Sequence, residues 1–204
     1  METASVTHWP LLSLLVWLPI LGGVFTLMAG NARPQAARWI ALAFALATFA
    51  CSIPLFTGFE LANPAMQFVE QRAWLPAYDI QYHLGADGIS LALIGLTTLT
   101  TVLVLIGAWT AIDKRVSQYY AAFLVLEGLM IGVFSALDAL LFYVFFEGML
   151  IPMFIIIGVW GGKRRVYASF KFFLYTLLGS VLMLLAIMAM YWQAGTTDIP
   201  TLLT

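Results

Sequence analysis

The chain alternates between long apolar runs and short polar segments. Six runs are long enough to cross the hydrocarbon core of a bilayer, which takes about 20 apolar residues in a helix. The runs are continuous rather than alternating, so they favour helices over a β-barrel. We predict a single all-α membrane domain over residues 1–204, with helices at about 9–29, 39–59, 89–112, 119–137, 139–160 and 170–192.

One loop, residues 60–88, is longer and more polar than the others. It contains two partly alternating stretches, "QFVEQRAW" and "YDIQYHL", separated by "LPA". This pattern predicts an outward-facing β-hairpin between the second and third helices. We expect Asp87 to cap the third helix. We expect His83 to lie on the surface of the hairpin, because it has no partner at metal-ligand spacing.

The basic residues gather on alternate loops. Only Arg72 lies in an opposite loop, and Lys171 opens the sixth run. By the positive-inside rule the basic loops face the cytoplasm or matrix, and both chain ends face the other side. No positive charge precedes the first run, so we interpret it as a retained anchor rather than a signal peptide. The seven residues of the basic loops are Arg33, Arg38, Lys114, Arg115, Lys163, Arg164 and Arg165.

The composition indicates that this chain lies in a lipid bilayer. It is 63% hydrophobic and 9% charged, whereas soluble domains are about half apolar and about a quarter charged. The net charge of −1 gives no reason to expect a nucleic-acid partner. The single cysteine, Cys51, excludes a disulfide within the chain and is expected to be an inert thiol.

Two acids lie deep within predicted helices: Glu127 in "FLVLEGLMIGVF" and Glu147 in "FFEGMLIPMF". A charged side chain at the centre of a bilayer costs roughly 3 kcal/mol. The fourth and fifth helices form an antiparallel pair, which places both acids roughly 14 to 15 Å from its outer end, near the midplane. Asp138 lies in the turn "SALDAL" between these helices and is expected to meet solvent.

The residues around the two acids indicate a site inside the protein. Gly128 and Gly132 form a GxxxG pattern that allows close approach of a neighbouring helix. Pro152 cannot donate a hydrogen bond to the carbonyl of Gly148, so we predict a kink and a free carbonyl beside Glu147.

A buried carboxyl can take up and release a proton, which suits a relay. The alternative is a permanently protonated, structural glutamate, and both interpretations stay open for Glu127 and Glu147. For Lys171 we consider an anchor at the membrane interface and, as the sharper hypothesis, a cationic partner on a proton entry path.

The segment "LLFYVFFEGMLIPMFIIIGVWGG", followed by "KFFLYTLLGSVLMLLAI", resembles the subunit M (chain 4) family of proton-pumping NADH–quinone oxidoreductase, respiratory complex I. "WLPAYDIQYHLGADGIS" also matches that family, so the likeness covers essentially the whole chain. The resemblance implies an antiporter-like subunit of the membrane arm, located in a bacterial inner membrane or a mitochondrial inner membrane. Its partners would be other membrane-arm subunits and the lipid bilayer.

Family members use a glutamate of the fifth helix, matched here by Glu147, together with a lysine on a later helix in proton transfer. Glu127 matches an acid found in part of the family. The resemblance implies no cofactor or metal in this chain, because NADH, flavin, iron–sulfur clusters and quinone belong to other subunits. Family members have about fourteen helices built on inverted repeats, so we expect an N-terminal fragment that stops before the lysine helix.

The resemblance makes the chain a translocase subunit of an NADH:quinone oxidoreductase, without a redox centre of its own. One alternative is the related subunit of a multisubunit cation/proton antiporter or membrane-bound hydrogenase. Another, from a different class, is a six-helix membrane scaffold without a transport role, in which the acids are packing residues.

Overall fold

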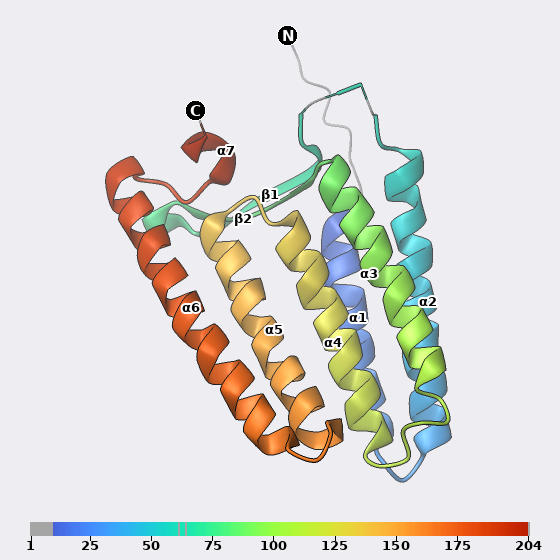
Figure 1. Cartoon of the computed structure of the whole chain (residues 1–204). Helices are drawn as coiled ribbons and strands as arrows, with labels where there is room; N and C mark the ends of the chain where they lie inside the picture. The colour runs from blue at the N-terminus through green and yellow to red at the C-terminus, as the bar shows by residue number, and fades with distance from the viewer. Residues whose placement is uncertain (1–9, 61, 64, 204) are drawn as a thin grey trace.

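A computed structural model describes residues 10–60, 62–63 and 65–203 of the chain, so the predicted helix start at Trp9 lies outside the described residues. Six long helices stand side by side, with a two-stranded hairpin lying across one end of the bundle (Figure 1). The elements in order are α1 (Leu11–Ala29), α2 (Pro34–Thr57), β1 (Gln67–Leu75), the 3-10 turn η1 (Pro76–Tyr78), β2 (Ile80–Ala86), α3 (Gly88–Gly107), α4 (Val116–Ser135), α5 (Ala139–Trp160), α6 (Arg165–Ala194) and α7 (Ile199–Leu202).

All six long helices have the length and apolar composition needed to cross a membrane. The antiparallel pair of β1 and β2 lies between α2 and α3 in the sequence. The predicted fold class, six membrane helices with a hairpin after the second, is therefore confirmed.

Three helix ends lie five residues from the limits of the apolar runs, and the other described ends lie within three residues of them. α2 begins at Pro34 rather than near residue 39, because proline at the first helical position is already set in a helical φ. α6 begins at Arg165 rather than near residue 170. α3 ends at Gly107 rather than near residue 112, where the carbonyl of Ile112 accepts a hydrogen bond from Arg38 Nη2 at 2.9 Å. An apolar run shows which residues can contact lipid. A helix, by contrast, begins and ends where the backbone hydrogen bonds within it begin and end, so its limits need not match those of the apolar run.

α4 is the central helix and packs against α1, α2, α3 and α5. A Cβ added to Gly128 would lie 2.4 Å from the carbonyl oxygen of Val16 on α1. A Cβ added to Gly132 would lie 2.7 Å from the ring of Phe145 on α5. The two glycines of the GxxxG pattern therefore allow close approach of two different helices, α1 at Gly128 and α5 at Gly132.

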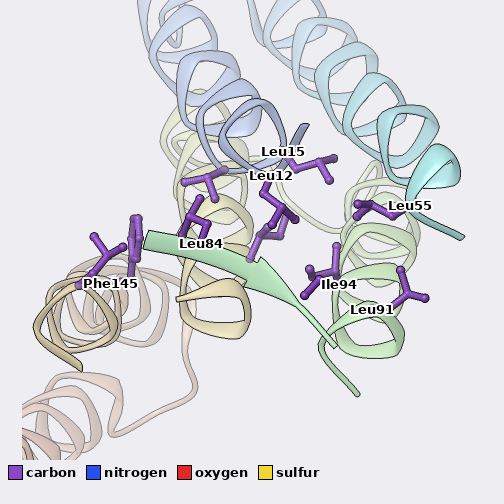
Figure 2. Close-up of a cluster of buried hydrophobic side chains, with 11 residues drawn as sticks. Leu12, Leu15, Leu55, Leu84, Leu91, Ile94 and Phe145 are labelled. Carbon is purple, nitrogen blue, oxygen red and sulfur yellow. The ribbon is translucent and has the colours of Figure 1, made fainter. Parts of the chain in front are cut away.

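A hydrophobic cluster fixes the hairpin on the helix ends. Leu84 of β2 belongs to a cluster with side chains of α1, α2, α3, α4 and α5, part of which Figure 2 labels. Glu70 of β1 adds a polar link, since its carboxylate accepts hydrogen bonds from the backbone N–H of Leu12 at 2.7 Å and from Ser13 at the start of α1. The labelled members of the cluster are Leu12, Leu15, Leu55, Leu84, Leu91, Ile94 and Phe145.

The turn between α4 and α5 lies between β2 and the segment that follows α6. The N–H of Leu137 donates to the carbonyl of His83 at 2.8 Å, and the N–H of Ile199 donates to the carbonyl of Leu137 at 2.8 Å. The N–H of Ala139 donates to the carbonyl of Thr197 at 2.9 Å. The polar segment after α6 is thus joined to the hairpin through this turn.

Two expectations about this end of the molecule are wrong. Asp138 does not meet solvent: it is 0% exposed, and its carboxylate accepts hydrogen bonds from Leu140 N, Leu141 N and Thr197 Oγ1. His83 is not a surface residue: it is 8% exposed, and its Nδ1 lies 2.7 Å from Asp198 Oδ1. Both errors have one cause, because the segment after α6 folds back and covers them.

Candidate functional site

Glu127 lies on the stripe of α4 that faces α3. It is 1% exposed, and both of its carboxyl oxygens lack a hydrogen-bond partner among the described residues. Its stripe also carries Phe123, Met130 and Phe134, which line a cavity of about 280 Å³ between α3 and α4. An unpaired buried carboxyl is costly, so Glu127 is an unusual polar group inside the helix bundle.

The opposite wall of this cavity carries threonines of α3. The hydroxyls of Thr97 and Thr101 donate to the carbonyls of Leu93 at 2.8 Å and Thr97 at 3.0 Å. Because their protons are engaged, these hydroxyls present only acceptor lone pairs to the cavity. The sequence reasoning missed these residues, although the polar "TTLTT" inside an apolar run could have indicated them.

Glu147 lies on the stripe of α5 that faces α6. Phe154, seven residues further along α5, stacks edge-on against Phe170 and Phe173 of α6 at 5.3 and 5.5 Å between ring centroids. Seven residues are nearly two full helical turns, so Glu147 shares the side of Phe154. Its Oε2 is buried and has no hydrogen-bond partner among the described residues.

The contacts between α5 and α6 also give the depth of Glu147. A Cβ added to Gly158 would lie 3.2 Å from Ser169 Oγ, so these two residues lie side by side. Because the helices are antiparallel, Glu147, eleven residues before Gly158, is level with Ser180, eleven residues after Ser169. Ser180 is buried and donates its hydroxyl to the carbonyl of Leu177 at 3.0 Å. α6 thus presents a serine at the level of the α5 glutamate.

The two glutamates do not face one another. α5 packs on the side of α4 that carries Leu129 and Gly132. Leu129 lies beside Gly148 of α5, and Gly132 lies beside the ring of Phe145. At 100° per residue, Glu127 lies roughly opposite that side, so the backbone of α4 stands between the two carboxyls. The same contacts make Glu147 level with Met130, so the carboxyls differ in depth by roughly 4.5 Å, one helical turn or less.

Pro152 lies inside α5, which continues through it from Ala139 to Trp160. The missing N–H leaves the carbonyl of Gly148 without its helical donor. This carbonyl belongs to the residue after Glu147, so a backbone oxygen without its helical donor lies one residue away from the glutamate.

Lys171 lies apart from both glutamates. It is exposed in the second turn of α6, two residues after Ser169 and so about 200° round the helix from the face that meets α5. Along the axis it is about 14 Å from the level of Ser180 and Glu147. It borders a shallow hollow with Arg164 and Tyr175 on the outer side of α6.

The acids with altered pKa outside the helices belong to the hairpin end of the molecule. Partial burial raises the pKa of Asp198, but hydrogen bonds from Thr201 and His83 outweigh it and hold the pKa below its usual value. A hydrogen bond from the backbone N–H of Ser90, 2.7 Å from Oδ1, lowers the pKa of Asp87. Asp87 thereby caps α3, as predicted. Within the described residues no group of three His, Cys, Asp or Glu side chains could hold a metal ion.

Sequence comparison places this arrangement among known membrane proteins. A family model described as "NADH:quinone oxidoreductase/Mrp antiporter, TM" matches residues 136–204. NADH-quinone oxidoreductase subunit M of Rhodobacter capsulatus is 54% identical over 198 residues, which are 95% of this chain and 38% of that protein. NADH-ubiquinone oxidoreductase chain 4 of Arabidopsis thaliana is 48% identical over 95% of this chain and 39% of its own length.

The predicted resemblance to the subunit M family is confirmed. A chain of respiratory complex I from Thermus thermophilus has the same fold, with a TM-score of 0.81 and 30% identity over 94% of this chain and 38% of that one. The Mrp complex from Dietzia sp. DQ12-45-1b shares the fold alone, with a TM-score of 0.79 and 18% identity over 95% of this chain and 21% of that one. The present chain thus spans 38% and 39% of the two curated subunit M and chain 4 relatives.

Proposed function

We propose that this chain takes part in proton translocation coupled to quinone reduction, as a membrane-arm subunit of an NADH–quinone oxidoreductase. The observation that carries the proposal is the half-buried Glu147 on the α6-facing side of α5, whose buried Oε2 has no hydrogen-bond partner among the described residues. The 54% identity to a subunit M supports complex I over an antiporter subunit. NADH, flavin, iron–sulfur clusters and quinone would be bound by other subunits.

In this proposal Glu147 is the principal proton-exchanging group. A carboxyl without a protein partner loses no hydrogen bond when it gives up its proton, provided that water or a cation reaches it. Ser180 of α6 is level with Glu147, and the free carbonyl of Gly148 belongs to the next residue of α5. Ordered water between these groups and Glu147 would provide a path for the proton through surroundings that are otherwise apolar.

Glu127 would act as a secondary group on the α3 side of α4. The α4 backbone separates it from Glu147, so a proton would pass between them around the helix through water rather than by direct contact. Lys171, on the outer face of α6, would serve as a cation at the basic end of the path. The proposed location is a bacterial inner membrane, with both chain ends outside and other membrane-arm subunits as neighbours.

Replacement of Glu147 by glutamine tests the proposal. In the intact subunit within its complex, Glu147→Gln keeps the shape of the side chain but cannot release a proton. We expect normal assembly together with a loss of at least about tenfold in proton pumping and in coupled quinone reduction, both measured on membrane vesicles. Glu127→Gln should have a smaller effect.

The matched control is Glu60→Gln, since Glu60 is an exposed acid of the loop that follows α2. It should leave pumping unchanged. Normal pumping by the Glu147→Gln complex would show that the proposed role is wrong.

A further inference from the structure

The loop between α3 and α4 and the start of α6 enclose a cleft on the basic side of the molecule. The cleft has a volume of about 630 Å³. Lys114 and Arg115 border it from one loop, and Arg165 and Val166 border it from α6. A second hollow of about 630 Å³ adjoins it and shares Arg165 and Val166. The α3–α4 loop and the start of α6 are distant in sequence, so this surface exists only because the fold brings them together.

The cleft is strongly positive. Lys114, Arg115 and Arg165 are all exposed, and the adjoining hollow adds Lys163 and Arg164. α6 reinforces the charge, because it begins here with no side-chain cap and no acidic residue in its first turn. The start of this 30-residue helix, which has no side-chain cap, carries partial positive charge toward the cleft.

The acidic residue that lines the cleft, Asp113, does not cancel its positive charge. Asp113 is exposed, and one of its carboxylate oxygens lies 3.9 Å from Arg38 Nη2. Its charge is therefore directed toward a cation of α2. Three cations against one partly engaged anion leave the cleft suited to an anionic ligand.

The floor of the cleft lies at the level of the membrane interface. Trp160, at the end of α5, donates its Nε1–H to the carbonyl of Lys114 at 2.9 Å and meets the ring of Tyr119 edge-on at 5.2 Å. Tryptophan at a helix end marks the headgroup region. Val166 and Tyr167 of α6 are 58% and 62% exposed beside it, so apolar surface continues from the cleft along the helix.

We propose that this cleft binds the phosphate headgroup of an anionic phospholipid, whose acyl chains lie along the exposed apolar face at the start of α6. Basic pockets between membrane helices on the cytoplasmic side bind such headgroups. The exposed apolar surface next to the cations favours a lipid over a free phosphate ion. The site uses none of the residues proposed for proton transfer, and it does not depend on that function.

The test measures lipid binding to the purified chain in detergent by native mass spectrometry. Phosphatidylglycerol and phosphatidylcholine of equal acyl length are added separately, and inorganic phosphate is added alone in a third arm. We expect phosphatidylglycerol to bind more tightly than phosphatidylcholine. Arg165→Gln should weaken its binding about fivefold, because each basic residue near a membrane surface contributes about 1 kcal/mol. Lys114→Gln, Arg115→Gln and Arg165→Gln together should remove the preference.

Arg33→Gln is the matched control, since Arg33 is exposed in the α1–α2 loop and does not border the cleft. It should keep the preference for phosphatidylglycerol. Three results would overturn the proposal: equal binding of both lipids, equal weakening by Arg33→Gln and Arg165→Gln, or inorganic phosphate that displaces the lipid at equal concentration. Thermal unfolding in phosphatidylcholine should be the same for all variants, which separates lost binding from lost folding.

Discussion

Two adjacent residues of α4, Glu127 and Gly128, point to different neighbours and have different roles. Glu127 places a carboxyl without a partner among the described residues against the α3 cavity, whereas the adjacent Gly128 brings the backbone of α1 into contact. A helix can do both because neighbouring residues point about 100° apart. The consequence is that a change at Gly128 should disturb packing without touching the cavity side directly.

We expect Gly128→Ala to destabilise the protein by about 1 to 3 kcal/mol, the usual cost of overpacking a core. The added Cβ would lie 2.4 Å from the carbonyl oxygen of Val16, a backbone atom that cannot move unless α1 moves. The measurement is the thermal unfolding of the chain in detergent.

Gly179 on α6 provides the matched control for this substitution. None of the described atoms lies within 4 Å of a Cβ added there. Gly179→Ala should therefore be neutral or should stabilise the helix by up to about 1 kcal/mol. Equal unfolding temperatures for the two alanine variants would contradict the close contact of α1 with α4.

At the scale of elements, one side chain joins the start of α5 to the segment after α6. Asp138 Oδ1 accepts from Leu140 N at 2.9 Å and Leu141 N at 3.1 Å, which caps α5. Its Oδ2 accepts from Thr197 Oγ1 at 2.6 Å. The helix that carries Glu147 is thereby fixed to the segment after α6, so Asp138 affects the site through the position of α5.

A graded series at Asp138 separates its two roles. Asp138→Asn keeps the cap oxygen but turns an amide toward the Thr197 hydroxyl, while Asp138→Ala removes both acceptors. We expect Asp138→Ala to cost about 1 kcal/mol for the cap and about 1 to 3 kcal/mol for the buried Thr197 hydroxyl left unpaired. Asp138→Asn should lie between it and the native chain.

Unfolding temperatures and the rate of proteolysis after α6 would measure these effects. Thr197→Val, which removes only the donor, is the control and should cost less than Asp138→Ala. If Asp138→Ala unfolds like the native chain and is cut no faster after α6, the joining role of Asp138 is wrong.

The long helices expose many apolar side chains that lipid can cover, most of all along α6. Leu174, Leu178 and Leu182 are among its exposed apolar side chains. The basic loops lie at one end of the bundle and the hairpin at the other (Figure 1). The structure therefore has a basic end and a hairpin end, and the positive-inside rule assigns the basic end to the cytoplasm or matrix.

Cysteine labelling tests this orientation. In a Cys51→Ser background, Gly162→Cys places a thiol in the α5–α6 loop and Ala62→Cys places one in the loop before β1, both at exposed positions. An impermeant maleimide should label Gly162→Cys in inside-out vesicles and Ala62→Cys in right-side-out vesicles. The reverse pattern would contradict the orientation. The chain without an added cysteine measures background labelling.

Sequence alone determined the six membrane helices, the hairpin, the cap at Asp87 and the resemblance to the subunit M family. Long apolar runs have one solution in lipid, because a buried backbone must satisfy its own hydrogen bonds within a helix. The same reasoning singled out Glu127 and Glu147, since an acid is conspicuous in an apolar run whatever its neighbours are.

Only the tertiary structure decided what these acids face. Rotation about a helix axis is set by side-chain packing between helices, and the contacts of Gly132 and Phe154 place Glu127 toward α3 and Glu147 toward α6. The burial of His83 and Asp138 was equally hidden, because their partners in the covering segment lie 115 and 59 residues away in the sequence. Local pattern fixes which residues form an element, whereas contacts distant in sequence fix which side of it is inside.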